Sequence, residues 1–126
     1  MKRIWILDPF HAGSHAQWAK GLDESLNQEG FACTLHTMPG RHWKWRMHGA
    51  AAWFAHSLFL NDAPEVIVTT DMCDVAQLKG LMPPSWSNVK VVTYFHENQL
   101  TFPWSPEDID PKTGRDLSYG YINLST

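Results

Sequence analysis

Four short apolar runs are spaced along the chain, and each is followed by a polar or proline-bearing turn. They cover residues 3–8, 31–37, 65–71 and 89–95. The runs are dense in Ile, Val, Leu and aromatic residues, which predicts buried β-strands. Pro9 is expected to end the first strand, because proline has no N–H to donate within a central ladder.

The segments between these runs have apolar residues at helical spacing. In the first segment Trp18, Leu22 and Leu26 share one face, with Ser14 as the expected N-cap and Gly30 as the expected end. The other two predicted helices are residues 45–61 and residues 74–82, the latter with Asp74 as its N-cap.

Alternation of strands and helices predicts an open doubly wound, Rossmann-like α/β sheet with parallel strands. In such sheets ligands bind at the carboxyl ends of the strands, where the strand order reverses. A spatial order of 3-2-1-4 would place the first and fourth strands side by side. The loops after residues 8 and 95 are therefore expected to border one cleft.

The chain of 126 residues fits one domain of globular composition, with 44% hydrophobic and 18% charged residues. We expect a core over residues 1–104, a loop over residues 105–116, and the start of a truncated helix over residues 117–126. The polypeptide looks like the front of a longer protein.

The formal net charge of −3 excludes a global positive field, so RNA would have to meet a local basic patch. No apolar run approaches the ~20 residues of a membrane span, and the N-terminus is too short in apolar residues for a signal peptide. Cys33 and Cys73 lack CxxC spacing and are expected to be buried thiols in a reducing compartment. These features predict a soluble, cytoplasmic protein.

The loop after the first strand reads DPFHAGSH. Gly13 and Ser14 lie at the mouth of a helix, where free amides and the helix dipole suit an anionic or hydroxyl-rich ligand; alternatively they form only a turn and a cap. His11 and His15 are four residues apart, a spacing that can hold a metal on a helix. Because His11 precedes the predicted helix and no HExxH motif is present, no metal site is predicted, and both histidines could equally be solvated or capping.

The loop after the fourth strand reads FHENQ. His96 titrates near neutrality, so it could serve as acid or base or bind a sugar hydroxyl; alternatively it orders the loop through backbone bonds. Glu97 adds a carboxylate. Asn98 and Gln99 carry donor and acceptor pairs that bind hydroxyls or base edges, or else they cap the following turn.

The segment RHWKWRMH follows the second strand and interleaves cations with aromatic rings. Arg41, Lys44 and Arg46 suit phosphates, and Trp43 and Trp45 suit stacked bases. The alternative is tryptophan buried under the second helix with solvated cations around it. One of the two indoles is expected to enter the core in either case.

The stretches LDPFHAGSHAQW, TMPGRHWKWRMHGAAAWFA, YFHENQLTFP and YGYINLST, in this order and spacing, resemble the amino-terminal domain of the tRNA-queuosine mannosyltransferases, which are related to glycosyltransferase family 4. The resemblance covers nearly the whole chain. It implies the amino-terminal half of a two-domain GT-B enzyme, whose C-terminal domain binds the sugar nucleotide and is absent from these residues.

The resemblance further implies transfer of mannose from GDP-mannose to the cyclopentenediol of queuosine in tRNA-Asp, with retention and without a metal or cofactor. The 126-residue chain alone is then expected to be inactive. A stand-alone nucleotide-binding or RNA-binding module and a glycosyltransferase with a non-tRNA acceptor stay open as alternatives. The implied roles are catalytic for His96, substrate-binding for Gly13, Ser14, His15, Glu97, Asn98 and Gln99, and RNA-binding for Arg41, Trp43, Lys44, Trp45 and Arg46.

Overall fold

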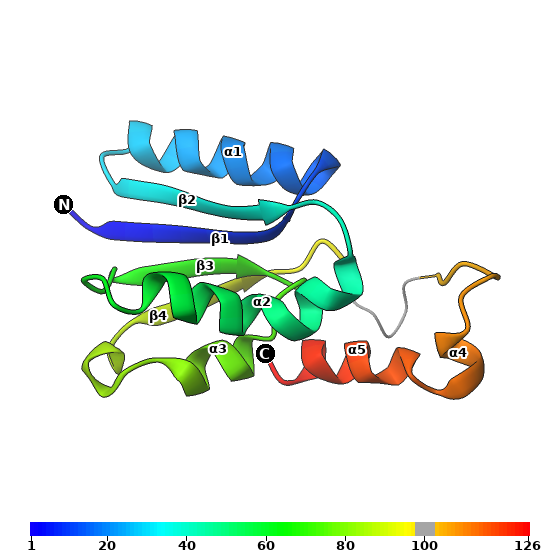
Figure 1. Ribbon diagram of the computed structural model, residues 1–126. Coiled ribbons are helices and arrows are strands. Elements are labelled where there is room, and N and C mark those ends of the chain that lie inside the picture. The colour runs from blue at the N-terminus through cyan, green and yellow to red at the C-terminus, as the bar shows by residue number, and fades with distance from the viewer. Residues whose placement is uncertain (98–102) are drawn as a thin grey trace.

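A computed structural model of the protein describes residues 1–97 and 103–126, and it shows a four-stranded parallel sheet with helices on both faces (Figure 1). The predicted open, parallel α/β fold is thereby confirmed. The strands are β1 (Arg3–His11), β2 (Ala32–Pro39), β3 (Val66–Thr70) and β4 (Lys90–Tyr94). The helices are α1 (Gly13–Gln28), α2 (Trp43–Leu58), α3 (Val75–Leu81), α4 (Asp110–Thr113) and α5 (Asp116–Leu124), with a 3-10 turn η1 (Pro84–Trp86).

The strand order is β2-β1-β3-β4, so the expected neighbourhood of the first and fourth strands is wrong. β3 lies between them and pairs in parallel with β1 on one side and β4 on the other. Burial explains the order. Ile67, Thr69 and Thr70 of β3 are fully buried, as a central strand requires, whereas β4 alternates between exposed and half-buried residues as an edge strand does. Strand order therefore reverses between β1 and β3.

Two predicted boundaries of the first βα unit are wrong. β1 continues through Pro9 to His11. Its register with β2 shifts between Asp8 and His11, so Pro9, which has no N–H, lies at an irregularity where the ladder does not require that donor. The N-cap of α1 is Ala12, and Ser14 lies inside the first turn without capping it. Gly30 follows the end of α1 with a φ of +91°, as predicted.

The α2 and α3 helices follow the sequence pattern closely. α2 begins at Trp43, two residues earlier than predicted. Asp74 is the N-cap of α3, and its side chain accepts a hydrogen bond from the N–H of Gln77 at 3.0 Å. Both helices cover one face of the sheet, and α1 covers β1 and β2 on the other (Figure 1).

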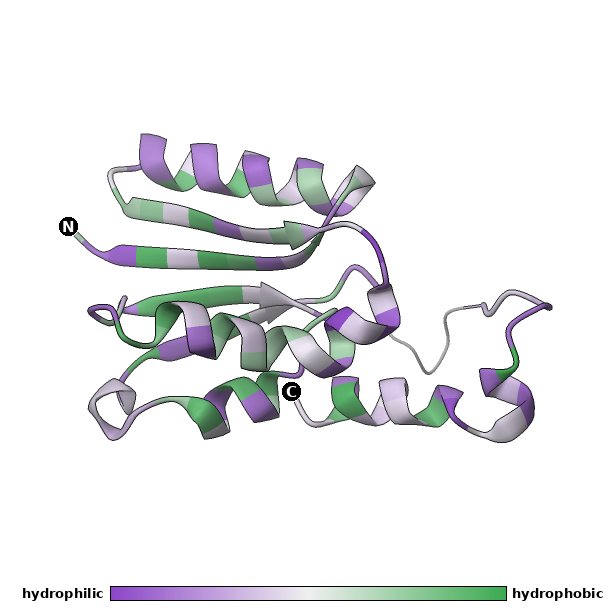
Figure 2. Cartoon of the chain, viewed as in Figure 1, coloured by the Kyte–Doolittle hydropathy of each residue, from purple (hydrophilic) through white to green (hydrophobic). Residues whose placement is uncertain are grey.

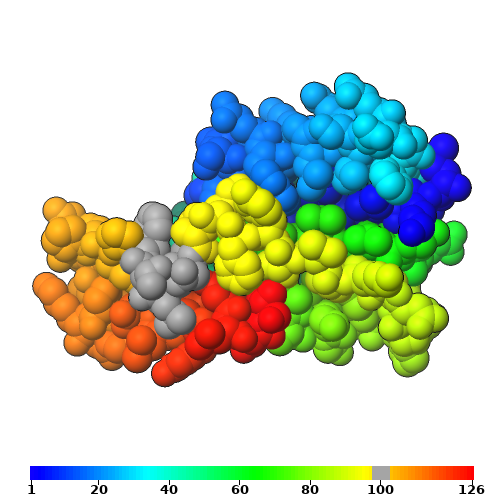
Figure 3. All heavy atoms as spheres, turned by 180° about the vertical axis from the view of Figure 1, so that it is seen from behind, coloured from blue at the N-terminus to red at the C-terminus, as the bar shows by residue number. Residues whose placement is uncertain are grey.

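The main core lies between the sheet and the α2 and α3 helices, and Figure 2 shows largely hydrophobic colouring along β1 and β3. Trp5 and Leu7 point from β1 toward Phe54 of α2 and Leu78 of α3. On the opposite side, seen in Figure 3, the end of β4 reaches the surface between α1 and α5. Val92 there is 51% exposed.

The expected loop over residues 105–116 contains the short helix α4, so this part of the prediction is wrong. Asp110 begins α4 and is bonded to Lys44 of α2, a long-range contact that local sequence does not reveal. The predicted helix near the end is confirmed as α5, whose Tyr119 and Ile122 pack on Met47 and Met72. None of the helices in the described residues has the length and apolarity to cross a membrane.

Candidate functional site

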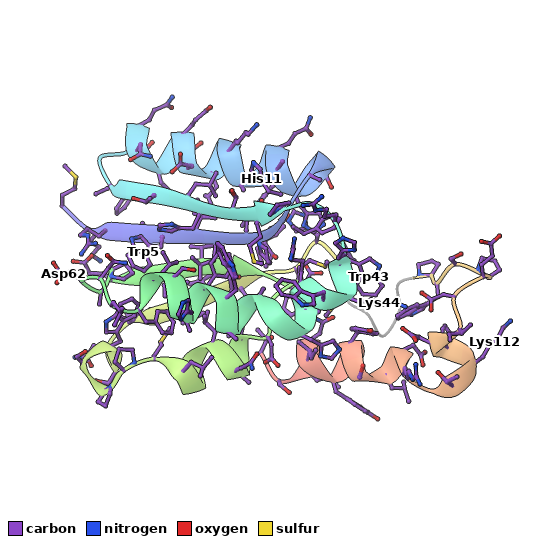
Figure 4. The ribbon with its side chains drawn as sticks, in the orientation of Figure 1. Trp5, His11, Trp43, Lys44, Asp62 and Lys112 are labelled. Carbon is purple, nitrogen blue, oxygen red and sulfur yellow. The ribbon has the colours of Figure 1, made fainter. Side chains whose placement is uncertain are left out.

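The carboxyl ends of β1 and β3 and the start of α2 meet at one edge of the sheet, close to the chain that leaves β4. A pocket of about 270 Å³ opens there. Figure 4 shows Trp43 and Lys44 at this end of the molecule and Asp62 at the opposite end. Because open α/β sheets bind ligands at this edge, the pocket is the candidate site. It is lined by Phe10, His15, Trp43, Met72, Glu97, Pro103, Trp104, Ser105 and Asp108.

Two histidines from distant parts of the chain come together beside the pocket. His15 lies in the first turn of α1 and His96 follows β4, and their ring centroids are 4.0 Å apart. Trp18 and Tyr94 stack with centroids 4.6 Å apart, and both meet the ring of His96 edge-on. The expectation that the loops after the first and fourth strands meet is confirmed, although β3 separates the strands themselves.

Burial keeps both imidazoles neutral at pH 7. It lowers the pKa of His15 against a smaller opposing effect of Asp8. It also lowers the pKa of His96, and the nearby His15 lowers this pKa further, against the attraction of Glu97 and Asp8. His15 Nδ1 and His96 Nε2 are buried and have no hydrogen-bond partner among the described residues. A neutral imidazole offers one donor and one acceptor, so this pair can bind hydroxyl groups without adding charge.

Asp71, directly after β3, fixes the loop that carries His96. Its Oδ1 accepts a hydrogen bond from the backbone N–H of His96 at 3.0 Å, and its own N–H donates to the carbonyl of Tyr94 at 3.2 Å. The amide of Asn123 in α5 donates to the Asp71 carbonyl at 3.0 Å. Asp71 therefore joins the ends of β3 and β4 to α5.

The Asp71 carboxyl group is fully buried, and its Oδ2 has no hydrogen-bond partner among the described residues. Burial raises the pKa of Asp71 to about 7, the hydrogen bond from His96 opposes this rise, and the charge of Glu97 adds to it. Asp71 was predicted only as the last residue of the third strand. An aspartate directly after a buried strand, at the ligand-binding edge of an α/β fold, is the signal that could have identified it.

The loop after β1 exposes backbone amides near the pocket. Gly13 has a φ of +53°, a conformation that favours glycine, and it lies with Ser14 on the surface. No side chain of the described residues caps the first turn of α1, so its first amides lack intrahelical partners and a side-chain acceptor. Buried Asp8 shapes this loop: its Oδ2 lies 2.6 Å from Nδ1 of His11, and its Oδ1 accepts the N–H of Phe10 at 3.2 Å.

Trp43 and Lys44, at the start of α2, join the pocket to the segment after residue 103. The ring centroids of Trp43 and Trp104 are 5.4 Å apart. The ammonium group of Lys44 lies 2.8 Å from Oδ2 of Asp108 and also bonds Asp110. Burial alone would lower the pKa of Lys44, but the hydrogen bonds to the two carboxylates outweigh it and raise the pKa. Lys44 therefore holds the pocket wall in place.

The rest of the RHWKWRMH segment is divided between interior and surface. Arg41 is exposed, and Trp45 is 50% exposed. Arg46 is buried: its Nε donates to the carbonyl of Pro39 at 3.3 Å, and its guanidinium lies 4.6 Å from the centroid of the Trp45 ring. Trp43 is the indole that enters the interior, as one of the two was expected to do.

Among the predicted substrate-binding residues, His15 and Glu97 line the pocket together, with Glu97 Oε1 3.9 Å from His15 Nε2. Asn98 and Gln99 lie outside the described residues. Within residues 1–97 and 103–126, no group of three or more histidine, cysteine or acidic residues is placed so that it could hold a metal ion.

Comparison with known proteins identifies a family and a curated relative. The family model described as "tRNA-queuosine alpha-mannosyltransferase N-terminal" matches residues 3–126. A tRNA-queuosine alpha-mannosyltransferase of Drosophila melanogaster is 34% identical over 121 residues, which are 96% of this chain and 30% of the relative. The chain thus spans less than a third of the length of this relative. The comparison with solved structures gives no match.

Proposed function

Because this chain belongs to the tRNA-queuosine alpha-mannosyltransferase family and corresponds to its N-terminal domain, we propose that it holds the acceptor in an enzyme that transfers mannose from GDP-mannose to queuosine in tRNA-Asp. In this proposal a further domain of a GT-B protein binds GDP-mannose and neutralises the leaving diphosphate. The chain alone would then bind the acceptor without turnover.

The observation that carries the proposal is the pairing of His15 and His96 beside an aromatic pocket at the carboxyl edge of the sheet. Trp43 and Trp104 supply π-faces on which a flat base can stack. Neutral imidazoles and the Glu97 carboxylate supply the donors and acceptors that a hydroxylated ring needs. These two kinds of wall suit a base that carries a cyclopentenediol.

We assign the catalytic role to His96. The lowered pKa of His96 favours a neutral imidazole, and its ring lies against His15 beside the pocket. A neutral imidazole nitrogen there can accept a hydrogen bond from the attacking hydroxyl and orient it toward the anomeric carbon. Gly13 and Ser14 would meet the diphosphate through the free amides of α1, with His15 beside them. Asn98 and Gln99 are proposed acceptor contacts.

RNA contact is proposed for the segment from Arg41 to Arg46. Arg41 and Trp45 reach the surface and could meet phosphate and base directly. Trp43 would contact the base inside the pocket, while Lys44 and Arg46 would act by holding the surrounding structure.

The test is a transfer assay that uses the longer protein, GDP-mannose and queuosine-bearing tRNA, with the 126-residue chain assayed beside it. His96→Ala should remove most transfer while leaving the melting temperature nearly unchanged. His36→Ala is the control, since His36 packs edge-on against Trp5 away from the pocket and should lower stability without a specific loss of transfer. Transfer to another acceptor, or RNA binding without any transfer, would replace the proposal by one of the two alternatives.

A further inference from the structure

One face of α2 is solvent-exposed and aromatic. The helix buries Met47, Ala50, Ala51 and Phe54 against the rest of the fold. Its opposite side presents residues three and four positions apart, which therefore form one continuous row. Its two indoles are about half exposed, at 50% for position 45 and 46% for position 53. We call this row the α2 stripe; it consists of Trp45, His48, Gly49, Ala52, Trp53 and His56.

The indoles of the α2 stripe are held in place by their own helix. A Cβ added at Gly49 would lie only 3.1 Å from Cε2 of Trp45, so the absence of a side chain there lets the indole lie against the helix. The Arg46 guanidinium packs 4.6 Å from the same ring. Trp53 meets Phe54 edge-on, with centroids 5.3 Å apart. Aromatic rings fixed before binding lose little conformational entropy when a flat partner stacks on them.

The segment that carries the α2 stripe has no acidic side chain of its own to repel a polyanion. Residues 30–61 contain no aspartate or glutamate, although the chain has 13 such residues and a net charge of −3. Within this stretch Arg41 is exposed beside the start of α2, and the stripe adds two histidines. The acidic partners of Lys44 come from outside it, at Asp108 and Asp110. Positive and neutral groups with exposed π-faces are the composition of a single-stranded nucleic-acid surface.

The outer face of α5 offers a contrast within the same chain. Leu117, Tyr121 and Leu124 are 47%, 58% and 65% exposed at helical spacing, and Asp116 lies beside them. That face is mainly aliphatic and offers a base a single ring, that of Tyr121. The α2 stripe has small residues between its rings and no aliphatic side chain larger than alanine, so nearly all of its exposed apolar area belongs to the two indoles, whose π-faces can stack on a base.

We propose that the α2 stripe is a stacking surface for single-stranded RNA, on which unpaired bases lie against Trp45 and Trp53. The inference rests on the proposed function for the identity of its RNA partner and extends the contact beyond the pocket. α2 begins at Trp43 in the pocket wall and runs back along the sheet (Figure 1). Nucleotides flanking a base in the pocket would follow this path. The two indoles are about 12 Å apart along the helix axis, whereas stacked neighbouring bases are ~3.4 Å apart. The bases that lie on Trp45 and Trp53 are therefore not neighbours in the RNA strand.

The test measures binding of a fluorescently labelled RNA stem-loop with an unpaired loop to the 126-residue chain, with a fully paired duplex for comparison. Trp45→Ala and Trp53→Ala should each weaken stem-loop binding by about 5-fold to 150-fold, the range known for base stacking on an aromatic side chain. Trp53→Phe should retain most of the affinity, whereas Trp53→Leu, which keeps apolar area without a π-face, should lose it. Tyr121→Ala removes a ring from α5 that is 58% exposed, somewhat more than either indole, and should leave binding unchanged.

Three results would overturn the inference: no stem-loop binding by the unmodified chain, unchanged binding by Trp53→Ala, or equal affinity of Trp53→Leu and Trp53→Phe. A change in oligomeric state of Trp53→Ala, without a change in RNA affinity, would assign the stripe to a protein partner instead. Failure of the transfer assay with the longer protein would remove the proposed function but would leave a measured loss of RNA binding intact. The two proposals therefore fail separately.

Discussion

Replacing Asp71 by asparagine should make the protein more stable at alkaline pH than the unmodified chain. The fold holds this carboxyl group fully buried, with its pKa raised from 3.8 to about 7. The native state therefore binds the proton more tightly than the unfolded chain, and stability is lost as the pH rises toward 7. One pKa unit corresponds to about 1.4 kcal/mol, so the ionised carboxylate costs up to about 4 kcal/mol at pH 8, of which about 3 kcal/mol develops above pH 5.

Asparagine cannot ionise, but its Oδ1 can still accept the N–H of His96. The amide nitrogen of asparagine takes the place of Oδ2, which has no hydrogen-bond partner in residues 1–97 and 103–126. A buried amide without an acceptor costs about 1 to 3 kcal/mol at every pH. That offset cancels when two pH values are compared. Urea unfolding, followed by tryptophan fluorescence, should show that the stability difference between Asp71→Asn and the unmodified chain moves by about 3 kcal/mol in favour of the variant from pH 5 to pH 8.

The matched control is Asp74→Asn, three residues further along at the N-cap of α3. Asparagine caps helices as well as aspartate does, so this change should leave stability nearly unchanged at both pH values. Parallel pH profiles for Asp71→Asn and the unmodified chain would refute the reasoning, because they would mean that the Asp71 carboxyl group does not carry its raised pKa in the fold.

Other predictions follow from single contacts. Gly49→Ala places a Cβ 3.1 Å from Cε2 of Trp45, so the half-exposed indole has to shift by a few tenths of an ångström. The melting temperature should rise, since alanine is favoured over glycine in a helix by up to about 1 kcal/mol, while the affinity for RNA should fall slightly; a melting temperature and an affinity that rise together would contradict this prediction. His42→Gly should stabilise the chain by about 1 kcal/mol in urea unfolding, because His42 has a φ of +55°. Lys44→Met should leave the carboxylates of Asp108 and Asp110 without their cation and speed hydrogen exchange in α4, whereas unchanged protection there would show that the Lys44 contacts do not hold this segment.

Local patterns predicted the elements of this fold well. The density of β-branched residues in β3 and the spacing of apolar residues in α1 depend only on neighbouring positions, and both elements form where they were expected. The N-cap at Asp74 is equally local. Strand order is not a local property. β3 pairs with β1 through residues 66–69, and which strand takes that place depends on the packing of the whole sheet.

The candidate site shows the same division. The polar loops after β1 and β4 identified His15 and His96, because polar residues directly after buried strands stand out in the sequence. Long-range partners did not stand out: Asp71, which bonds His96, is 25 residues away from it in the chain, and Asp108, which bonds Lys44, is 64 residues away. Contacts at such separations are set by tertiary structure. The sequence therefore predicted Lys44 as a free cation, whereas the structure pairs it with Asp108 and Asp110.

The most direct test of the account is whether the pocket binds the queuosine base. The imidazole resonances of His15 and His96 can be followed by NMR while the 126-residue chain is titrated with queuosine nucleoside, with guanosine as the matched ligand that lacks the cyclopentenediol. We expect queuosine to shift the resonances of both histidines with saturation and guanosine to shift them less or not at all, with the exposed His56 unaffected by either. Equal responses to the two nucleosides, or none at His15 and His96, would contradict the assignment of this pocket to the acceptor.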